Sequence, residues 1–239
     1  MDKRKAITFS YDDGVQQDKR LIAILDKYGL KCTFNLNSGR PGDKMAYERT
    51  VFNVTKTLQH HNIPQDEIKE VYKNHEVAAH SAHHPILTTL SDREILLEMG
   101  EDAKCLEKIV GKKVNGFAYP GGLCEYYNQR VKNIIKNNTQ LYYGRTARSC
   151  YSFDLPTDLM IFHPTVSHRE VQAREELARK FLDLNPDKPQ LFYIWGHSYE
   201  LDASEQAWRE FEGFCQMLSG REDIFYGTND EVFQYFGLK

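Results

Sequence analysis

Two adjacent carboxylates follow an apolar run near the start of the chain. In TFSYDDG (residues 8–14), Asp12 and Asp13 come directly after strand-forming residues and before a glycine. Because the backbone turns where a strand ends, the two side chains can reach one site from different directions. One carboxylate can then bind a metal while the other stays free as a base. The alternative is structural, because Asp-Gly is also a common turn dipeptide.

A group of histidines has a spacing that suits metal binding. In HSAHH, His80 and His84 are four residues apart, so a helical turn after the preceding strand would place both rings on one face. Two neutral imidazoles and one carboxylate are a recurring open zinc set that leaves a position for water or substrate. The alternative is that these histidines are solvated in a polar turn. His83 and the pair His60 and His61 carry no such argument and are interpreted as surface histidines or outer neighbours of the site.

Two further segments, AYPGG (118–122) and WGHSYE (195–200), also place polar or small residues after an apolar run. The C-terminal ends of the strands form the reactive face of a parallel α/β barrel, so we expect all four segments to meet there. The near-neutral pKa of histidine makes His197 a candidate proton donor. The alternative is a histidine at the edge of the core. Glu200 could orient His197 or cap the loop.

The elements that must position these residues follow a βα pattern. Apolar runs of strand length alternate with helical patterns, which predicts a mainly parallel α/β sheet. Strands are expected at 6–10, 32–37, 75–80, 114–120, 141–145, 159–163, 190–197 and 224–226. Between them, helices are expected over 21–28 and near 65–73, 91–110, 126–137, 170–184 and 204–218. A further, last helix is expected to begin at Thr228, with Glu231 at capping-box spacing. Residues 38–63 carry the weakest pattern and are expected to form an inserted excursion over the rim of a single domain spanning 1–239.

Charge and composition exclude several classes of partner. The net charge is −3 and no long run of one sign occurs, which argues against nucleic acid or an anionic membrane. No run approaches the roughly 18 apolar residues that a membrane span needs, and a strand from Thr8 onward leaves no secretory leader. A cytoplasmic protein is therefore expected. The five scattered cysteines lack a CxxC pair, which argues against a disulfide framework or a thiolate zinc site.

Together these motifs resemble those of the polysaccharide deacetylase family (carbohydrate esterase family 4, the NodB homology domain). The resemblance implies a distorted (β/α) barrel of about seven parallel strands, with a divalent metal held by Asp-His-His. Zinc is the first expectation, with cobalt, nickel, manganese or iron as alternatives. The resemblance also implies hydrolysis of N-acetyl groups on amino sugars. TFSYDDG matches the first motif and HSAHH the second. WGH resembles the last motif. The resemblance implies that Asp12 is the catalytic base and that His197 is the catalytic acid. It also implies that Trp195 lines the pocket and that the metal ligands are Asp13, His80 and His84.

The third family motif, Arg-x-Pro-Tyr-Gly, is met only in part. In AYPGG, Ala118 stands where the arginine would be and Gly121 where the tyrosine would be, while Pro120 and Gly122 align. The aspartate motif that follows in the family is not recognisable. In the family that arginine orients the catalytic base and pairs with the aspartate. Two arginines that follow another predicted strand, Arg145 and Arg148, could supply this positive charge instead. The alternative is that both are solvated surface residues.

The remaining candidates concern the acyl group and the oxyanion. The N–H of Gly121 could donate to the oxyanion beside Pro120, and Trp195, with Tyr119 nearby, could form an apolar wall for the acetyl methyl. His163 is a candidate for the rim. The expected function is a metal-dependent deacetylase of an amino sugar, oligosaccharide or polysaccharide, with the oligomeric state open. Two alternatives are a hydrolase of another C–N bond, such as a formamide or cyclic imide, and a silent carbohydrate-binding protein. A base and an acid together favour an enzyme.

Overall fold

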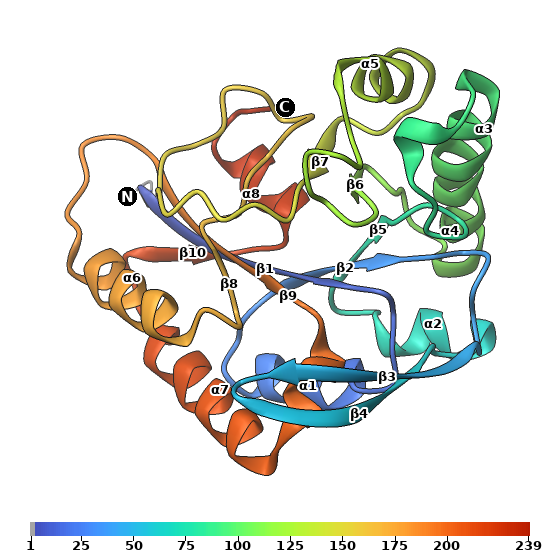
Figure 1. Cartoon of the computed structure of the whole chain (residues 1–239). Coiled ribbons are helices and arrows are strands. Elements are labelled where there is room, and N and C mark those ends of the chain that lie inside the picture. Colours follow the sequence, from blue (N-terminus) through green and yellow to red (C-terminus); the bar gives the residue numbers. More distant parts are fainter. Residues whose placement is uncertain (1–2) are drawn as a thin grey trace.

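The computed structural model describes residues 3–239, and its main sheet curls into a distorted (β/α) barrel, which confirms the predicted fold (Figure 1). Seven strands follow the order β7-β6-β5-β2-β1-β9-β8, and β10 pairs with the first half of β1. All these pairings are parallel. The strands are β1 (Lys5–Asp12), β2 (Cys32–Leu36), β5 (Glu76–Ala79), β6 (Gly116–Ala118), β7 (Tyr143–Arg145), β8 (Val166–Ser167), β9 (Gln190–Gly196) and β10 (Ile224–Tyr226).

Helices alternate with the strands and surround the sheet in Figure 1. The main α-helices are α1 (Asp18–Lys27), α2 (Gln65–Val71), α3 (Asp92–Leu96), α4 (Asp102–Val110), α5 (Gln129–Asn138), α6 (Val171–Asp183), α7 (Glu205–Leu218) and α8 (Asn229–Tyr235). Shorter helical segments are η1 (Leu87–Thr89), η2 (Leu97–Glu101) and η3 (Ser198–Ala203). Within residues 3–239, no helix combines the length and apolarity that crossing a bilayer requires. All five cysteines are free thiols.

Two predicted helix starts are confirmed by their caps. Ser91 and Thr228 each form a capping box with the glutamate three residues later, at the starts of α3 and α8. The helix predicted over 91–110 is not uniform, because the π-helical turn η2 separates α3 from α4. Gly100 lies in this turn, and glycine has a low intrinsic preference for regular helix.

The two central strands explain the most apolar stretches of the sequence. Every residue of β1 and of β9 is buried. Strands of a parallel barrel are covered on both faces, so they read as continuous apolar runs rather than alternating ones. The polar residues that follow these runs are therefore held at the ends of rigid, fully packed elements.

The strand predicted at 159–163 does not form. Asp158 begins a turn instead, because its carboxylate accepts from the Met160 N–H and its carbonyl accepts from the Ile161 N–H. The segment closes the barrel beside β7 through irregular contacts, including the bond from Thr146 N–H to the Phe162 carbonyl. Met160 and Phe162 are buried, while Leu159 and Ile161 are half-buried. Within residues 3–239, the only ladder pairing of this run is an isolated parallel bridge between Phe162 and Arg145. The apolar run therefore indicates partial burial and does not form a regular strand.

Residues 38–63 contain a regular antiparallel hairpin, formed by β3 (Lys44–Val51) and β4 (Val54–His61). The turn residues Phe52 and Asn53 have φ values of 50° and 60°, as a tight two-residue hairpin turn requires. The pattern is weak in the sequence because most of β3 and β4 is exposed or half-buried. The hairpin contributes side chains to the pocket described next.

Candidate active site

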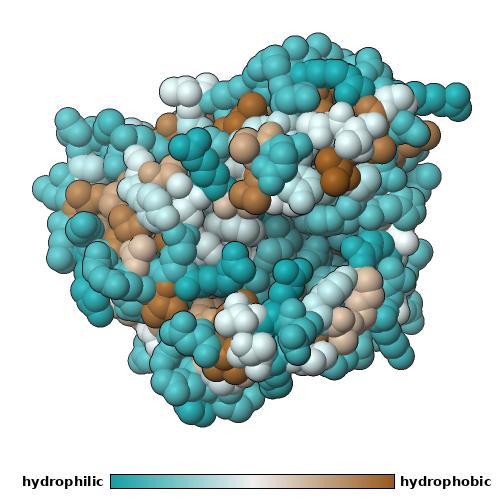
Figure 2. Space-filling view, in the orientation of Figure 1, coloured by the Kyte–Doolittle hydropathy of each residue, from teal (hydrophilic) through white to brown (hydrophobic). Residues whose placement is uncertain are grey.

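A pocket of about 380 Å³ lies at the C-terminal ends of the barrel strands. Figure 2 shows a recess near the middle of this face, with mostly hydrophilic residues along its border. The end of β1, the loop after β5, the end of β7 and the end of β9 all contribute to its lining. Three of the four segments expected to meet contribute polar side chains here, and AYPGG contributes Tyr119 and Gly121.

Asp13, His80 and His84 come together as a potential metal-binding set. Their ligand atoms all lie within 4.8 Å of one another. The Nδ1–H of His80 donates to the Ala118 carbonyl over 2.9 Å, which leaves Nε2 directed at Asp13, 3.7 Å from its Oδ1. A backbone acceptor on the far nitrogen is the usual way to hold a metal-binding imidazole in the correct tautomer. The donor set and its orientation therefore fit a zinc-like divalent ion.

The two histidines meet through a strained loop, and the expected helical turn is absent. Ser81 and His84 both have positive φ, 61° and 60°, and the Ser81 hydroxyl accepts from the His84 N–H over 3.0 Å. The His80 and His84 ring centroids are 4.8 Å apart. Asp13 also has a positive φ, of 78°. Backbone conformations that are uncommon outside glycine thus occur at two residues of the candidate metal-binding set, Asp13 and His84, and at Ser81 beside His80, as they often do at functional sites.

His60 supports Asp13 from the hairpin. Its Nε2 lies 3.0 Å from Asp13 Oδ2, so one carboxylate oxygen is hydrogen-bonded and the other faces His80. Burial alone would raise the pKa of Asp13, but the bond to His60 and the nearby histidine charges lower it. The sequence reasoning assigned His60 no definite role. Its only signal was its place in the predicted rim segment, and its neighbour His61 does not line the pocket.

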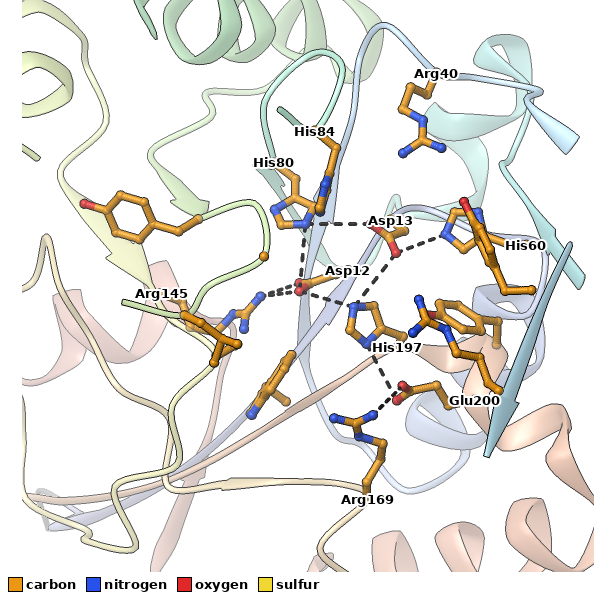
Figure 3. Close-up of a pocket in the computed structure, with 18 residues that line it drawn as sticks. Asp12, Asp13, Arg40, His60, His80, His84, Arg145, Arg169, His197 and Glu200 are labelled. Atoms are coloured by element: carbon orange, nitrogen blue, oxygen red, sulfur yellow. Dashed lines mark hydrogen bonds and ion pairs between the residues drawn. The ribbon is translucent and has the colours of Figure 1, made fainter. Parts of the chain in front are cut away.

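The second carboxylate, Asp12, has a different set of partners. Arg145 donates to both of its oxygens, over 2.6 Å to Oδ1 (Figure 3). Asn35 Nδ2 also donates to Oδ1, over 2.8 Å. Burial would raise the pKa of Asp12, but Arg145 and then the histidines lower it. Arg145 is paired in register with Ala118 on the neighbouring strand. The guanidinium is therefore supplied from β7, one strand away from the family position.

His197 lies between the carboxylates and Glu200 (Figure 3). Its Nε2 is 3.9 Å from an oxygen of both Asp12 and Asp13, and its Nδ1 is 3.6 Å from Glu200 Oε2. Burial would lower the pKa of His197, but Glu200 and then Asp13 and Asp12 raise it to about 9. His197 is therefore protonated at neutral pH in this arrangement.

Glu200 is held in turn by residues that are not in the pocket wall. His168 Nε2 donates to Glu200 Oε2 over 2.7 Å, and Tyr11 OH lies 3.1 Å from His168 Nδ1. The missing side chain of Gly196 makes room for this arrangement, because a Cβ there would lie 2.4 Å from the His168 ring. The sequence places His168, like His163, after a strand-like run with a possible position at the rim, but the side chain is buried and does not line the pocket, and nothing local indicates that it reaches Glu200.

The residues predicted to bind the acyl group differ in how well their side chains are exposed to the pocket. Trp195 lines it, and Arg145 lies over its ring at 4.7 Å. Gly121 has a φ of 69°, and a Cβ there would lie 2.6 Å from the Tyr126 ring, so only glycine fits. Tyr119 also contributes to the lining, but its hydroxyl donates to the Met160 carbonyl and its side chain belongs to the core. It is therefore poorly placed to form an acetyl wall.

Three predicted residues lie outside the pocket lining. Arg148 is exposed, so of the two candidate arginines only Arg145 reaches Asp12. His163 is hydrogen-bonded through Nδ1 to the Thr146 hydroxyl over 2.6 Å, and it does not line the pocket. Pro120 is buried beneath the loop and does not line the pocket. Its cyclic side chain fixes the backbone before Gly121.

Comparison with known proteins identifies a matching family and similar structures. A family model described as polysaccharide deacetylase matches residues 1–142. The Xyl-CE4 domain of a multidomain xylanase from the hindgut metagenome of Trinervitermes trinervoides has 18% identity and a TM-score of 0.59, with coverage of 98% of this chain and 92% of that one. A family 4 carbohydrate esterase from Streptomyces lividans, in complex with acetate, has 14% identity and a TM-score of 0.58, with coverage of 94% and 93%.

A third similar structure covers less of its own chain. The deacetylase PplD from Streptococcus pyogenes, in complex with acetate, has 21% identity and a TM-score of 0.51. The match covers 64% of this chain and 61% of PplD, so the chain spans less than two thirds of that protein. No curated protein sequence matches the chain. At these identities the structural likeness establishes the fold.

Proposed function

The chain belongs to the polysaccharide deacetylase family, and from that premise we propose that it is a metal-dependent hydrolase that removes N-acetyl groups from an amino sugar, an oligosaccharide or a polysaccharide. One observation carries the proposal. A cluster of Asp13, His80 and His84 with metal-binding geometry lies beside a separate carboxylate, Asp12, and a separate histidine, His197, in one pocket. Metal-assisted amide hydrolysis needs these three functions together.

Asp13, His80 and His84 would hold the ion. When bound, a divalent metal would lower the pKa of a water molecule from about 15.7 to roughly 7 and polarise the acyl carbonyl. Asp12 is kept anionic by Arg145, so it can accept the proton of the attacking water. Because His60 is hydrogen-bonded to Asp13 and Arg145 to Asp12, the two carboxylates are held for separate tasks.

The leaving amine must gain a proton as the C–N bond breaks. His197 is protonated at neutral pH and its Nε2 faces the same space as Asp12, so it can donate that proton. The Gly121 N–H makes no hydrogen bond to residues 3–239 and borders the pocket, so it can donate to the developing oxyanion. Trp195 lines the pocket and offers an apolar surface for the acetyl methyl group.

Acetate release from N-acetylated sugars tests this function directly. Oligomers of N-acetylglucosamine are incubated with the purified protein, with a chelator, and with the chelator followed by zinc. We expect acetate in the first sample, a large loss with chelator, and recovery with zinc. Metal content should be lost in His80→Ala but retained in His83→Ala, because His83 is exposed and bonded to Glu98. Acetate release that ignores the chelator would refute metal dependence, and formate release from formamides would redirect the substrate assignment.

The pH profile should report His197 through Glu200. The acid must be protonated, so activity falls as pH rises through the pKa of His197, which Glu200 helps to raise to about 9. Glu200→Gln removes the main raising influence, so the alkaline limb of kcat against pH should move to lower pH. The exposed variant Glu222→Gln should keep the wild-type limb. An unchanged limb in Glu200→Gln, with wild-type thermal stability, would remove His197 from the role of acid.

A further inference from the structure

The charges that line the pocket are not balanced. Four arginines and three carboxylates border it, in a protein whose net charge is −3. Asp12 is paired with Arg145, while Asp13 accepts a hydrogen bond from His60 and Glu200 accepts one from His168, which lies outside the pocket lining. The other arginines of the lining are Arg40, Arg49 and Arg169, and of these Arg169 is ion-paired to Glu200.

The arginines that remain have weak partners or none. Arg40 is 3.5 Å from the exposed carboxylate of Asp43. Arg169 is 3.3 Å from Glu200 and about half exposed. Within residues 3–239, Arg49 has no carboxylate within ion-pair distance, and its guanidinium lies 5.5 Å from the centroid of the Tyr47 ring. Figure 3 shows Arg40 and Arg169 at opposite ends of the group of labelled side chains.

Tyr199 lines the pocket together with two of these arginines, Arg49 and Arg169. Burial raises the pKa of the Tyr199 hydroxyl, and the positive charges of Arg49 and Arg169 act in the opposite direction. The Tyr199 hydroxyl makes no hydrogen bond to the described part of the chain. Its ring is packed against His60 and His197, with centroids 5.0 and 5.4 Å away. A hydroxyl donor and two guanidinium groups therefore border the same pocket.

We propose that the pocket accepts an N-acylated sugar that carries an anionic group, a carboxylate or a phosphate, and that Arg49, Arg169 and Tyr199 bind this group. The inference rests on the proposed deacetylase function. Guanidinium groups bind planar or tetrahedral oxyanions through paired, charge-assisted hydrogen bonds. A neutral sugar would gain little from these two guanidinium groups.

The position of this anion-binding group indicates which part of the substrate carries the charge. Tyr199 is packed against His197, the residue assigned to protonate the departing amine. The amine stays on the sugar, and the acyl group leaves on the other side of the broken bond. The anionic group is therefore attached to the sugar, near its amine-bearing carbon, and is not part of the acyl group.

Matched sugars with and without charge test the proposal on the zinc-loaded protein. The probes are N-acetylglucosamine, its 6-phosphate, and N-acetylmuramic acid, which adds a carboxylate. We expect at least one charged probe to show a kcat/KM and a calorimetric affinity roughly tenfold above those of the neutral sugar, the size of one charge-assisted contact. This preference should shrink as the salt concentration rises.

Arginine variants test which residues cause the preference for charged sugars. Arg49→Gln should reduce the ratio of charged to neutral affinity by roughly tenfold. Arg179→Gln, on the exposed face of α6 beside Glu175, should leave the ratio unchanged. Arg169→Gln should also lower the ratio, but it removes a partner of Glu200, so Arg49 is the decisive position.

The outcomes separate the two proposals. Equal affinity for charged and neutral sugars, or a preference that survives in Arg49→Gln, would overturn the anion site. Arg49-dependent binding of a charged sugar without acetate release would support the anion site and refute the deacetylase function. A preference for the phosphate over the carboxylate, or the reverse, would identify the anionic group.

Discussion

Asp12→Asn is expected to lower kcat by about 10²–10⁴-fold, the usual contribution of a positioned general base. Asparagine keeps the size of the side chain and cannot accept the proton. The metal content should stay at the wild-type level, because Asp13, His80 and His84 are unchanged. Single-turnover acetate release and metal analysis on the same preparation measure both quantities.

Loss of the Asp12 charge also affects Arg145, which is only 1% exposed. The variant must therefore be shown to be folded, for example by its thermal transition, before its rate is interpreted. Asp187→Asn, at an exposed position outside the pocket, is the matched control and should behave as wild type. An Asp12→Asn protein that is folded, binds metal and keeps the wild-type rate would show that another group is the base.

Arg145→Gln is the second variant with a large expected effect, on both stability and rate. It leaves the buried Asp12 carboxylate with Asn35 but without its cation, and breaking one side of a buried ion pair typically costs about 3–5 kcal/mol. Arg145 is the strongest of the influences that lower the pKa of Asp12 against burial, so without it that pKa rises. Because the base must be ionised, the acidic limb of the rate profile should move to higher pH.

The stability change should depend on pH in a defined direction. In the wild type the pKa of Asp12 is below its unfolded value, so its pairing stabilises the fold above that unfolded value. This stabilisation is lost as the pH falls through the folded pKa. The free energy of unfolding of wild type and Arg145→Gln should therefore converge in acid, which denaturant titrations at several pH values will measure.

Arg148→Gln is the natural control, since Arg148 is three residues further along and exposed. It should leave stability, rate and pH profile unchanged. If Arg145→Gln also left the acidic limb in place, Arg145 would have only a packing role against Trp195. A double variant, Arg145→Ala with Ala118→Arg, returns the cation to the register-paired position on β6 and should recover part of the rate.

Much of the fold and the reacting groups was predictable from local sequence. The apolar runs of β1 and β9 mark strands that are buried on both faces, and the residues that end them could only project from a strand terminus. The capping boxes at Ser91 and Thr228 begin helices through hydrogen bonds within four residues. Features of this kind depend on contacts between residues close in the chain, so they can be predicted from the local sequence.

Other features escaped because the residue types did not reveal the backbone path. The run at 159–163 is apolar and partly buried, but the side chain of Asp158 turns its backbone. His80 and His84 approach each other through a strained loop rather than the helix their spacing suggests. In both cases the residue types were informative and the backbone path between them was not.

The sequence by itself determined which groups could react: two carboxylates, two histidines at ligand spacing and a histidine at another strand end. Only the tertiary structure decided which cation or imidazole each of them meets. Arg145 is 133 residues from Asp12, and His60 is 47 residues from Asp13. Strand order, register and the packing of the hairpin bring these partners together. In a desolvated pocket, the charge state of each carboxylate depends strongly on its partner. The partners brought together by tertiary packing therefore distinguish the proposed base, Asp12, from the proposed metal ligand, Asp13.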